Sequence, residues 1–135
     1  MFSGEYYNSI DSKYRLIVPA KFRDELGRKC YLTKSNDNCL YLFTLEEWER
    51  HARELMALPT GSADARIRIR KFTANAVEVE VDSQYRITIP QKLRELVGIQ
   101  KEVVTVGFIN KIEIWSREEY ERVMQLPDDG EYEYV

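Results

Sequence analysis

The chain has 135 residues, of which 44% are hydrophobic and 32% charged, and its formal net charge is −3. This size allows one domain or two small halves and excludes a large multidomain enzyme, and the composition is that of a soluble globular protein. Because we find no long apolar run and no positively charged leader, we expect a cytoplasmic protein with no membrane partner.

An internal repeat organises the chain. Residues 11–27, DSKYRLIVPAKFRDELG, recur as residues 82–98, DSQYRITIPQKLRELVG, and residues 40–50 match residues 112–122 after one residue of slip. The two halves are therefore two copies of one unit. We divide the chain into a first repeat (1–59), a connecting segment (60–75), a second repeat (76–127) and an acidic, loose tail (128–135).

Each repeat predicts the same order of elements. A short strand leads into an Asp-Ser-x-Tyr turn, a second strand, a helix between a proline and a glycine, and a hairpin. Each hairpin is followed by a capping box, Thr44 to Glu47 or Ser116 to Glu119, in which hydroxyl and carboxylate cap the helix reciprocally. The predicted strands are 5–10, 15–18, 77–81 and 86–89, and the predicted hairpins are 30–43 and 102–115.

The connecting segment is ambiguous. Residues 66–72 alternate Arg and Ile as an exposed strand does, whereas Ser62 as an N-cap, followed by Ala, Ile and Phe, fits a helix. We favour the helix.

One repeat has too few strands to bury both of its faces, so the two repeats are expected to pair. The predicted fold is α+β and mainly β: one small pseudo-twofold β-barrel built from both repeats, with helices on its flanks.

The cysteines and the histidine argue against catalysis. Cys39 lies near the turn of its hairpin and Cys30 about four rungs away, too far for a disulfide, so both thiols are expected to be reduced. The single histidine, His51, falls on the polar side of its helix and is expected to be solvated. No metal-ligand spacing, nucleophile elbow or phosphate loop is found. We therefore predict a protein that is not an enzyme, with no cofactor, metal or small-molecule substrate.

The repeated turns are the candidate site. An Asp that fixes an Arg presents a planar donor fork suited to phosphate or guanine, although the same pair could simply be a salt bridge that shapes the turn, and the two roles can coexist. The predicted turn-organising residues are Asp11, Asp82, Ser12 and Ser83. The predicted DNA-binding residues are Arg15, Arg86, Lys13, Lys21, Arg23, Lys92 and Arg94. We assign Arg15 and Arg86 to guanine and Lys21 and Lys92 to phosphates, and Arg66, Arg68, Arg70 and Lys71 could join the two clusters.

These paired Asp-x-x-x-Arg turns, with MFSGEY at the start, VPAKFR, AVEVEVD and IEIW, closely resemble the bacterial MraZ family over nearly the whole chain. The resemblance implies two swapped-hairpin repeats related to AbrB and SpoVT and a ring-shaped homo-oligomer. It also implies a nucleoid-associated transcriptional regulator, typically a repressor of its own division and cell-wall gene cluster, that binds direct repeats in double-stranded promoter DNA. The family signature maps onto Asp11, Arg15, Asp82 and Arg86.

Two departures from the family and two other functions stay open. The family has Gly where this chain has Tyr14 and Tyr85, and Tyr disfavours a positive φ, so the conformation of these turns is not fixed. Asn75 replaces another family glycine, and because Asn tolerates the left-handed region we expect an unchanged backbone there. The alternatives are an AbrB-type antitoxin, for which the residues after Pro127 look too few, and an oligomeric scaffold that does not bind DNA, which the negative net charge favours slightly.

Overall fold

The computed structural model describes residues 1–127; the predicted acidic tail lies outside the described residues. The first repeat contains β1 (Glu5–Ser9), β2 (Arg15–Ile17), the 3-10 turn η1 (Ala20–Phe22), α1 (Arg23–Leu26), β3 (Lys29–Lys34), β4 (Leu40–Thr44) and α2 (Leu45–Met56). The connecting helix α3 (Ala63–Ala74) leads into the second repeat, which contains β5 (Val77–Glu80), β6 (Arg86–Thr88), α4 (Gln91–Val97), β7 (Glu102–Phe108), β8 (Lys111–Ser116) and α5 (Arg117–Met124). Within this part of the chain, no helix is long and apolar enough to cross a membrane.

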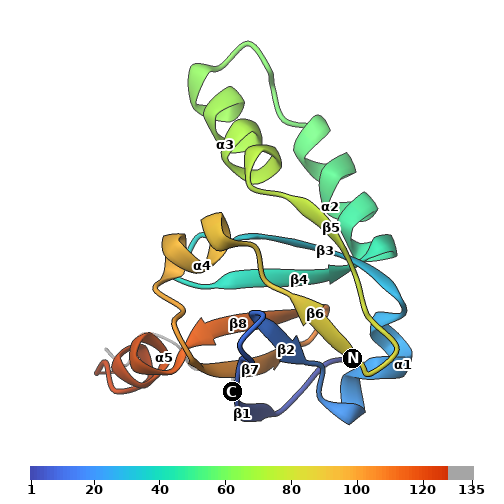
Figure 1. The fold of residues 1–135 in the computed structure, drawn as a ribbon. Helices are drawn as coiled ribbons and strands as arrows, with labels where there is room; N and C mark the ends of the chain where they lie inside the picture. The colour runs from blue at the N-terminus through green and yellow to red at the C-terminus, as the bar shows by residue number, and fades with distance from the viewer. Residues whose placement is uncertain (128–135) are drawn as a thin grey trace.

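The two repeats exchange their opening strands. Six antiparallel strands form one sheet in the order β1-β7-β8-β4-β3-β5, so β1 joins the hairpin of the second repeat and β5 joins that of the first (Figure 1). The two hairpins meet at the centre, where β4 pairs with β8. Neither repeat could complete this sheet alone, as the pairing argument predicted.

The predicted closed barrel was wrong. β2 and β6 pair only with each other, in a separate two-stranded sheet whose register joins Arg15 to Thr88 and Ile17 to Arg86. Each of these strands is three residues long, and two residues after its last residue comes a proline, Pro19 or Pro90, which has no amide hydrogen for a further rung. Within residues 1–127, β1 and β5 therefore remain the edges of an open sheet.

The main core lies between the six-stranded sheet and the β2–β6 pair. Leu16 and Ile87 of the β2–β6 pair are at most 2% exposed and pack with residues from α1, α4 and one face of the large sheet. Burying one such side chain stabilises the fold by about 1.5–3 kcal/mol. The core thus holds the β2–β6 pair, and the turns that lead into it, against a rigid support.

The other face of the sheet is covered by α2, α3 and α5. The segment 63–74 is helical, as favoured from the sequence, and the Ser62 hydroxyl accepts the Ala65 amide at 3.4 Å. Phe72 of α3 stacks on Trp48 of α2 at 4.7 Å between ring centroids, and Trp48 stacks on Tyr31 of β3 at 4.4 Å. A second cluster, which includes Trp115 and Tyr120, packs beneath α5.

The prediction of a solvated His51 holds only in part: its side chain is 39% exposed, and the rest of the ring lies against aromatic side chains. Its imidazole lies 4.8 Å from the Phe72 ring and 5.7 Å from the Phe43 ring, because α3 folds back over that side of α2. The resulting burial lowers the pKa of His51.

Three local predictions have mixed outcomes. Cys30 and Cys39 form no disulfide with each other, as expected. Both are also buried, and burial raises the pKa of each thiol to about 12. The capping boxes are only half formed, because Thr44 and Ser116 accept amides while the carboxylates of Glu47 and Glu119 bind nearby arginines instead. Asn75 does not use the left-handed conformation that asparagine tolerates: it has a φ of −98° and ends α3.

Candidate nucleic-acid interface

The turn before β2 is built around one carboxylate. Oδ1 of Asp11 accepts the amides of Lys13 and Arg15 at 2.9 and 3.0 Å, and Oδ2 accepts Nε of Arg15 at 2.7 Å. The Arg15 amide, with the guanidinium and the Lys13 amide, lowers the pKa of Asp11 despite partial burial. The acid therefore stays ionised and fixes both the turn and the arginine.

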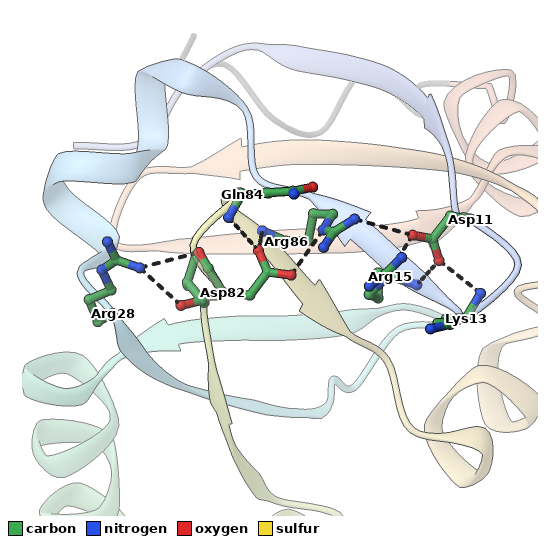
Figure 2. A network of polar contacts seen from close by, with 8 residues as sticks. Asp11, Lys13, Arg15, Arg28, Asp82, Gln84 and Arg86 are labelled. Carbon is green, nitrogen blue, oxygen red and sulfur yellow. Dashed lines mark hydrogen bonds and ion pairs between the residues drawn. The ribbon is translucent and has the colours of Figure 1, made fainter.

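The turn before β6 repeats this geometry. Oδ1 of Asp82 accepts the amides of Gln84 and Arg86 at 2.8 and 2.9 Å, and Oδ2 accepts Nε of Arg86 at 2.9 Å (Figure 2). Partial burial opposes ionisation of Asp82, but these hydrogen bonds outweigh it and lower its pKa. Nη1 of Arg86 also lies 3.9 Å from Oδ2 of Asp11, so the two turns share one polar network.

Each arginine keeps donors available. Arg15 and Arg86 use Nε for the aspartate, and within residues 1–127 their Nη atoms donate no hydrogen bond. Their side chains are 28% and 24% exposed. A guanidinium held at Nε, with Nη atoms that donate no hydrogen bond, can bind a phosphate or a guanine edge at little entropic cost. Nη1 of Arg86 also faces Oδ2 of Asp11, which would keep that fork in place.

The two turns whose conformation the sequence did not fix adopt the left-handed conformation at their tyrosines. Tyr14 and Tyr85 both have a φ of 61°. The carbonyl of each tyrosine accepts an amide from the opposite repeat, from Ile89 at 3.0 Å and from Val18 at 2.7 Å. These cross-repeat hydrogen bonds hold a backbone that costs a non-glycine residue about 1 kcal/mol.

Arginines of the opposite repeat cover these tyrosine rings. Arg94 of α4 lies 3.6 Å from the ring centroid of Tyr14, and Arg23 of α1 lies 4.2 Å from that of Tyr85. Arg23 also donates Nε to the Val18 carbonyl at 2.9 Å, and Arg94 donates to the carbonyl of Ile89. Sequence reasoning assigned both arginines to DNA and missed these contacts, although tyrosine at the family's glycine position was a signal.

The predicted lysines lie around this network. Lys13 is in the first turn, and Lys21 and Lys92 are in η1 and α4, directly after β2 and β6. All three are exposed, and none has a side-chain hydrogen bond or ion pair within residues 1–127. The hydroxyls of Ser12 and Ser83 likewise make no hydrogen bond in this part of the chain.

Arg28 was not among the predicted residues. Its Nη1 donates to the carbonyl of Asp82 at 3.2 Å, and it lines a hollow of about 220 Å³ together with Arg23 and Tyr85. The backbone carbonyl of Arg28 accepts the amide of Val81. In the other repeat, the carbonyl of Lys101 accepts the amide of Ile10 in the same way, so Lys101 is the counterpart of Arg28. This equivalence depends on strand pairing and could not be seen in the sequence.

The arginines of α3 do not join the basic clusters. α3 is fixed to the opposite face of the large sheet, where the Thr33 hydroxyl donates to the Phe72 carbonyl at 3.0 Å. The expectation for Arg66, Arg68, Arg70 and Lys71 was therefore wrong, and the candidate interface consists of the two turns, the β2–β6 pair and the first residues after each strand. We call this surface the β2–β6 face.

Comparison with known proteins agrees with the duplicated architecture. The family described as "MraZ protein, putative antitoxin-like" matches residues 1–71 and again residues 72–128. The chain belongs to the MraZ family. A transcriptional regulator MraZ from Thermoanaerobacter sp. is 50% identical over 95% of this chain and 90% of its own length. Proteins of the same name from Caldanaerobacter subterraneus subsp. tengcongensis and Caldicellulosiruptor saccharolyticus are 48% and 50% identical, over 95% and 92% of this chain and 90% and 87% of their own lengths.

Proposed function

We propose that this MraZ-family chain is a sequence-specific DNA-binding transcriptional regulator that acts by binding rather than by catalysis. The names of its relatives support the regulatory role. The observation that supports the β2–β6 face as the interface is the duplicated Asp–Arg geometry, with matching aspartate contacts in both repeats.

The two arginine forks suit a duplex. They lie on one paired element, β2 with β6, and each presents Nη donors that match the O6 and N7 acceptors of guanine in the major groove. Lys21 and Lys92 flank the forks and suit phosphates, which fix position without reading sequence. Arg23 and Arg94, stacked on tyrosines, border the same face.

The more specific parts of the proposed function rest on the resemblance to the family. We propose a nucleoid-associated repressor of its own division and cell-wall gene cluster that binds direct repeats in promoter DNA as a ring-shaped homo-oligomer. Exposed apolar side chains on the outer helices, Met56 at 70% and Met124 at 64%, support self-association away from the β2–β6 face. Several protomers on spaced repeats would raise the total affinity without new contacts.

The decisive experiment compares alanine variants on DNA from upstream of the protein's own gene and on a scrambled duplex at matched salt. Arg15→Ala or Arg86→Ala should cost about 1–3 kcal/mol per engaged site on the native sequence. Lys21→Ala or Lys92→Ala should weaken both duplexes alike and reduce the salt slope by about 0.9 per lost contact. Melting curves check folding, because Asp11 and Asp82 lose their partners in the arginine variants.

A matched charge control is available on the opposite face. Arg68→Ala removes the same charge from exposed α3 and should leave affinity nearly unchanged. If a folded Arg15→Ala, Arg86→Ala double variant kept its preference for the native sequence, the arginines would be structural. If the wild-type chain bound neither duplex, it would be a scaffold or act on another partner.

The oligomer is tested separately by light scattering at micromolar concentration. We expect a mass above that of a dimer. A monomer near 16 kDa would contradict the ring.

A further inference from the structure

The two halves of the β2–β6 face share a backbone but differ in one turn side chain. Lys13 and Gln84 occupy the same place, two residues after the aspartate and directly before the tyrosine at a φ of 61°. Their amides are held by Asp11 and Asp82 at 2.9 and 2.8 Å. Figure 2 shows them on the two separate turns of the network.

Neither side chain contributes to the scaffold. Both are exposed, and within residues 1–127 their hydrogen bonds are made through the backbone amide only. The nature of the side chain therefore changes what the turn presents to a ligand without changing the turn itself.

The two side chains prefer different bases. A lysine donates to the O6 and N7 acceptors of guanine, whereas a glutamine amide both donates and accepts and so matches the N6 and N7 pattern of adenine. A pseudo-twofold face with equal side chains in both turns would read the same base in each half-site. With Lys13 in one turn and Gln84 in the other, the half-sites differ.

We propose that Lys13 and Gln84 give the β2–β6 face a direction on DNA, with guanine preferred beneath the first turn and adenine beneath the second. This inference rests on the proposed DNA-binding function. Unequal half-sites make each protomer bind in one orientation, as an array of repeats in one direction requires.

The test is selection from a pool of randomised duplexes with the purified full-length protein. The wild type should select half-sites that differ at the position beneath the turns, with about a tenfold preference for guanine in one and for adenine in the other. Lys13→Gln should select adenine in both half-sites, and Gln84→Lys should select guanine in both. Melting curves should match the wild type, because only exposed side chains change.

The double exchange Lys13→Gln, Gln84→Lys is the matched control. It should return the wild-type selection, because the pseudo-twofold face can bind the same sequence turned round. A structural or purely electrostatic role would not predict this rescue.

The outcomes separate the two claims. If the wild type selects one sequence but places the same base beneath both turns, or if the single variants keep its unequal half-sites, the direction proposal is overturned while DNA binding stands. If the wild type selects no sequence, the proposed function fails and this inference fails with it.

Discussion

The two repeats are nearly the same on the β2–β6 face and clearly different on the outer face of the large sheet. On the β2–β6 face, both aspartates bind the arginine four residues later in the same way and both tyrosines have a φ of 61°. On the outer face, Tyr41 of β4 lies directly opposite Glu113 of β8, although these are equivalent positions in the two repeats.

The helices that pack on the outer face also differ between the two repeats. The first repeat uses α2 together with α3, joined through Trp48 and Phe72, whereas the second uses the short α5 with the buried Tyr120. Each half of the outer face packs against its own helices, so its side chains can differ between repeats. The β2–β6 face is one paired element, so both copies must supply compatible turns.

The largest predicted effect concerns Gly107 of β7, whose counterpart in β3 is Lys34. A Cβ on Gly107 of β7 would lie 2.2 Å from the backbone nitrogen of Ser3, which belongs to a segment anchored by buried Phe2. Because backbone atoms cannot yield locally, Gly107→Ala should lower the free energy of unfolding by about 3 kcal/mol in urea denaturation. Its counterpart Lys34→Ala should cost well under about 1 kcal/mol. Equal losses would show that the close approach of Ser3 to Gly107 does not constrain this position.

Phe72→Ala tests whether the two faces are independent. It removes the ring that stacks on Trp48 and His51, and because this ring is only half-buried we expect a loss of about 2 kcal/mol. Ile67→Ala on the exposed side of the same helix should change stability by less than about 0.5 kcal/mol. DNA affinity, measured below the unfolding transition, should match the wild type in both. A weakened affinity in the folded Phe72 variant would show that α3 and the β2–β6 face are coupled.

The difference between local and non-local contacts explains which features of the fold could be predicted from the sequence. The order of elements followed from Pro19, Gly27 and their copies, because such residues act through local backbone geometry. Barrel closure depended on how far β2 and β6 continue beyond three residues, and the burial of His51 depended on α3 folding back. The stacking of Arg94 on Tyr14 joins residues of different repeats. Such non-local contacts leave no periodic signal in the sequence.

Replacing Glu113 by glutamine removes the charge that distinguishes it from its uncharged counterpart Tyr41 at the centre of the outer face. Burial raises the pKa of Glu113, opposed by the hydrogen bond from Trp115 Nε1 at 3.0 Å. The folded chain therefore binds this proton more tightly than the unfolded chain, so the contribution of Glu113 to stability is present below about pH 4.3 and is lost as the pH rises through the folded pKa. Glu113→Gln should remove this loss and stabilise the chain at pH 7 by about 1 kcal/mol.

The measurement is the difference in free energy of unfolding between Glu113→Gln and the wild type from pH 4 to pH 8. Asp11 and Asp82, whose lowered pKa values act with the opposite sign, cancel in this difference. The exposed Glu118→Gln serves as the charge control. A difference that did not grow with pH would mean that the Glu113 carboxylate is well solvated in the fold.

The smallest predicted effect tests what the two copies of the turn share. Tyr14→Ala keeps the left-handed backbone, which the hydrogen bond from Ile89 holds, but removes the ring beneath Arg94, so we expect a loss of about 1 kcal/mol. Tyr14→Gly removes the same ring and also relieves a backbone cost of about 1 kcal/mol, so its stability should return close to that of the wild type. Asn75→Gly is the matched control, because a residue at a φ of −98° gains nothing from glycine and should be destabilised. Thermal unfolding of the three variants measures these differences. If Tyr14→Gly were no more stable than Tyr14→Ala, the turn would not be strained, and the cation–π contact alone would account for the tyrosine.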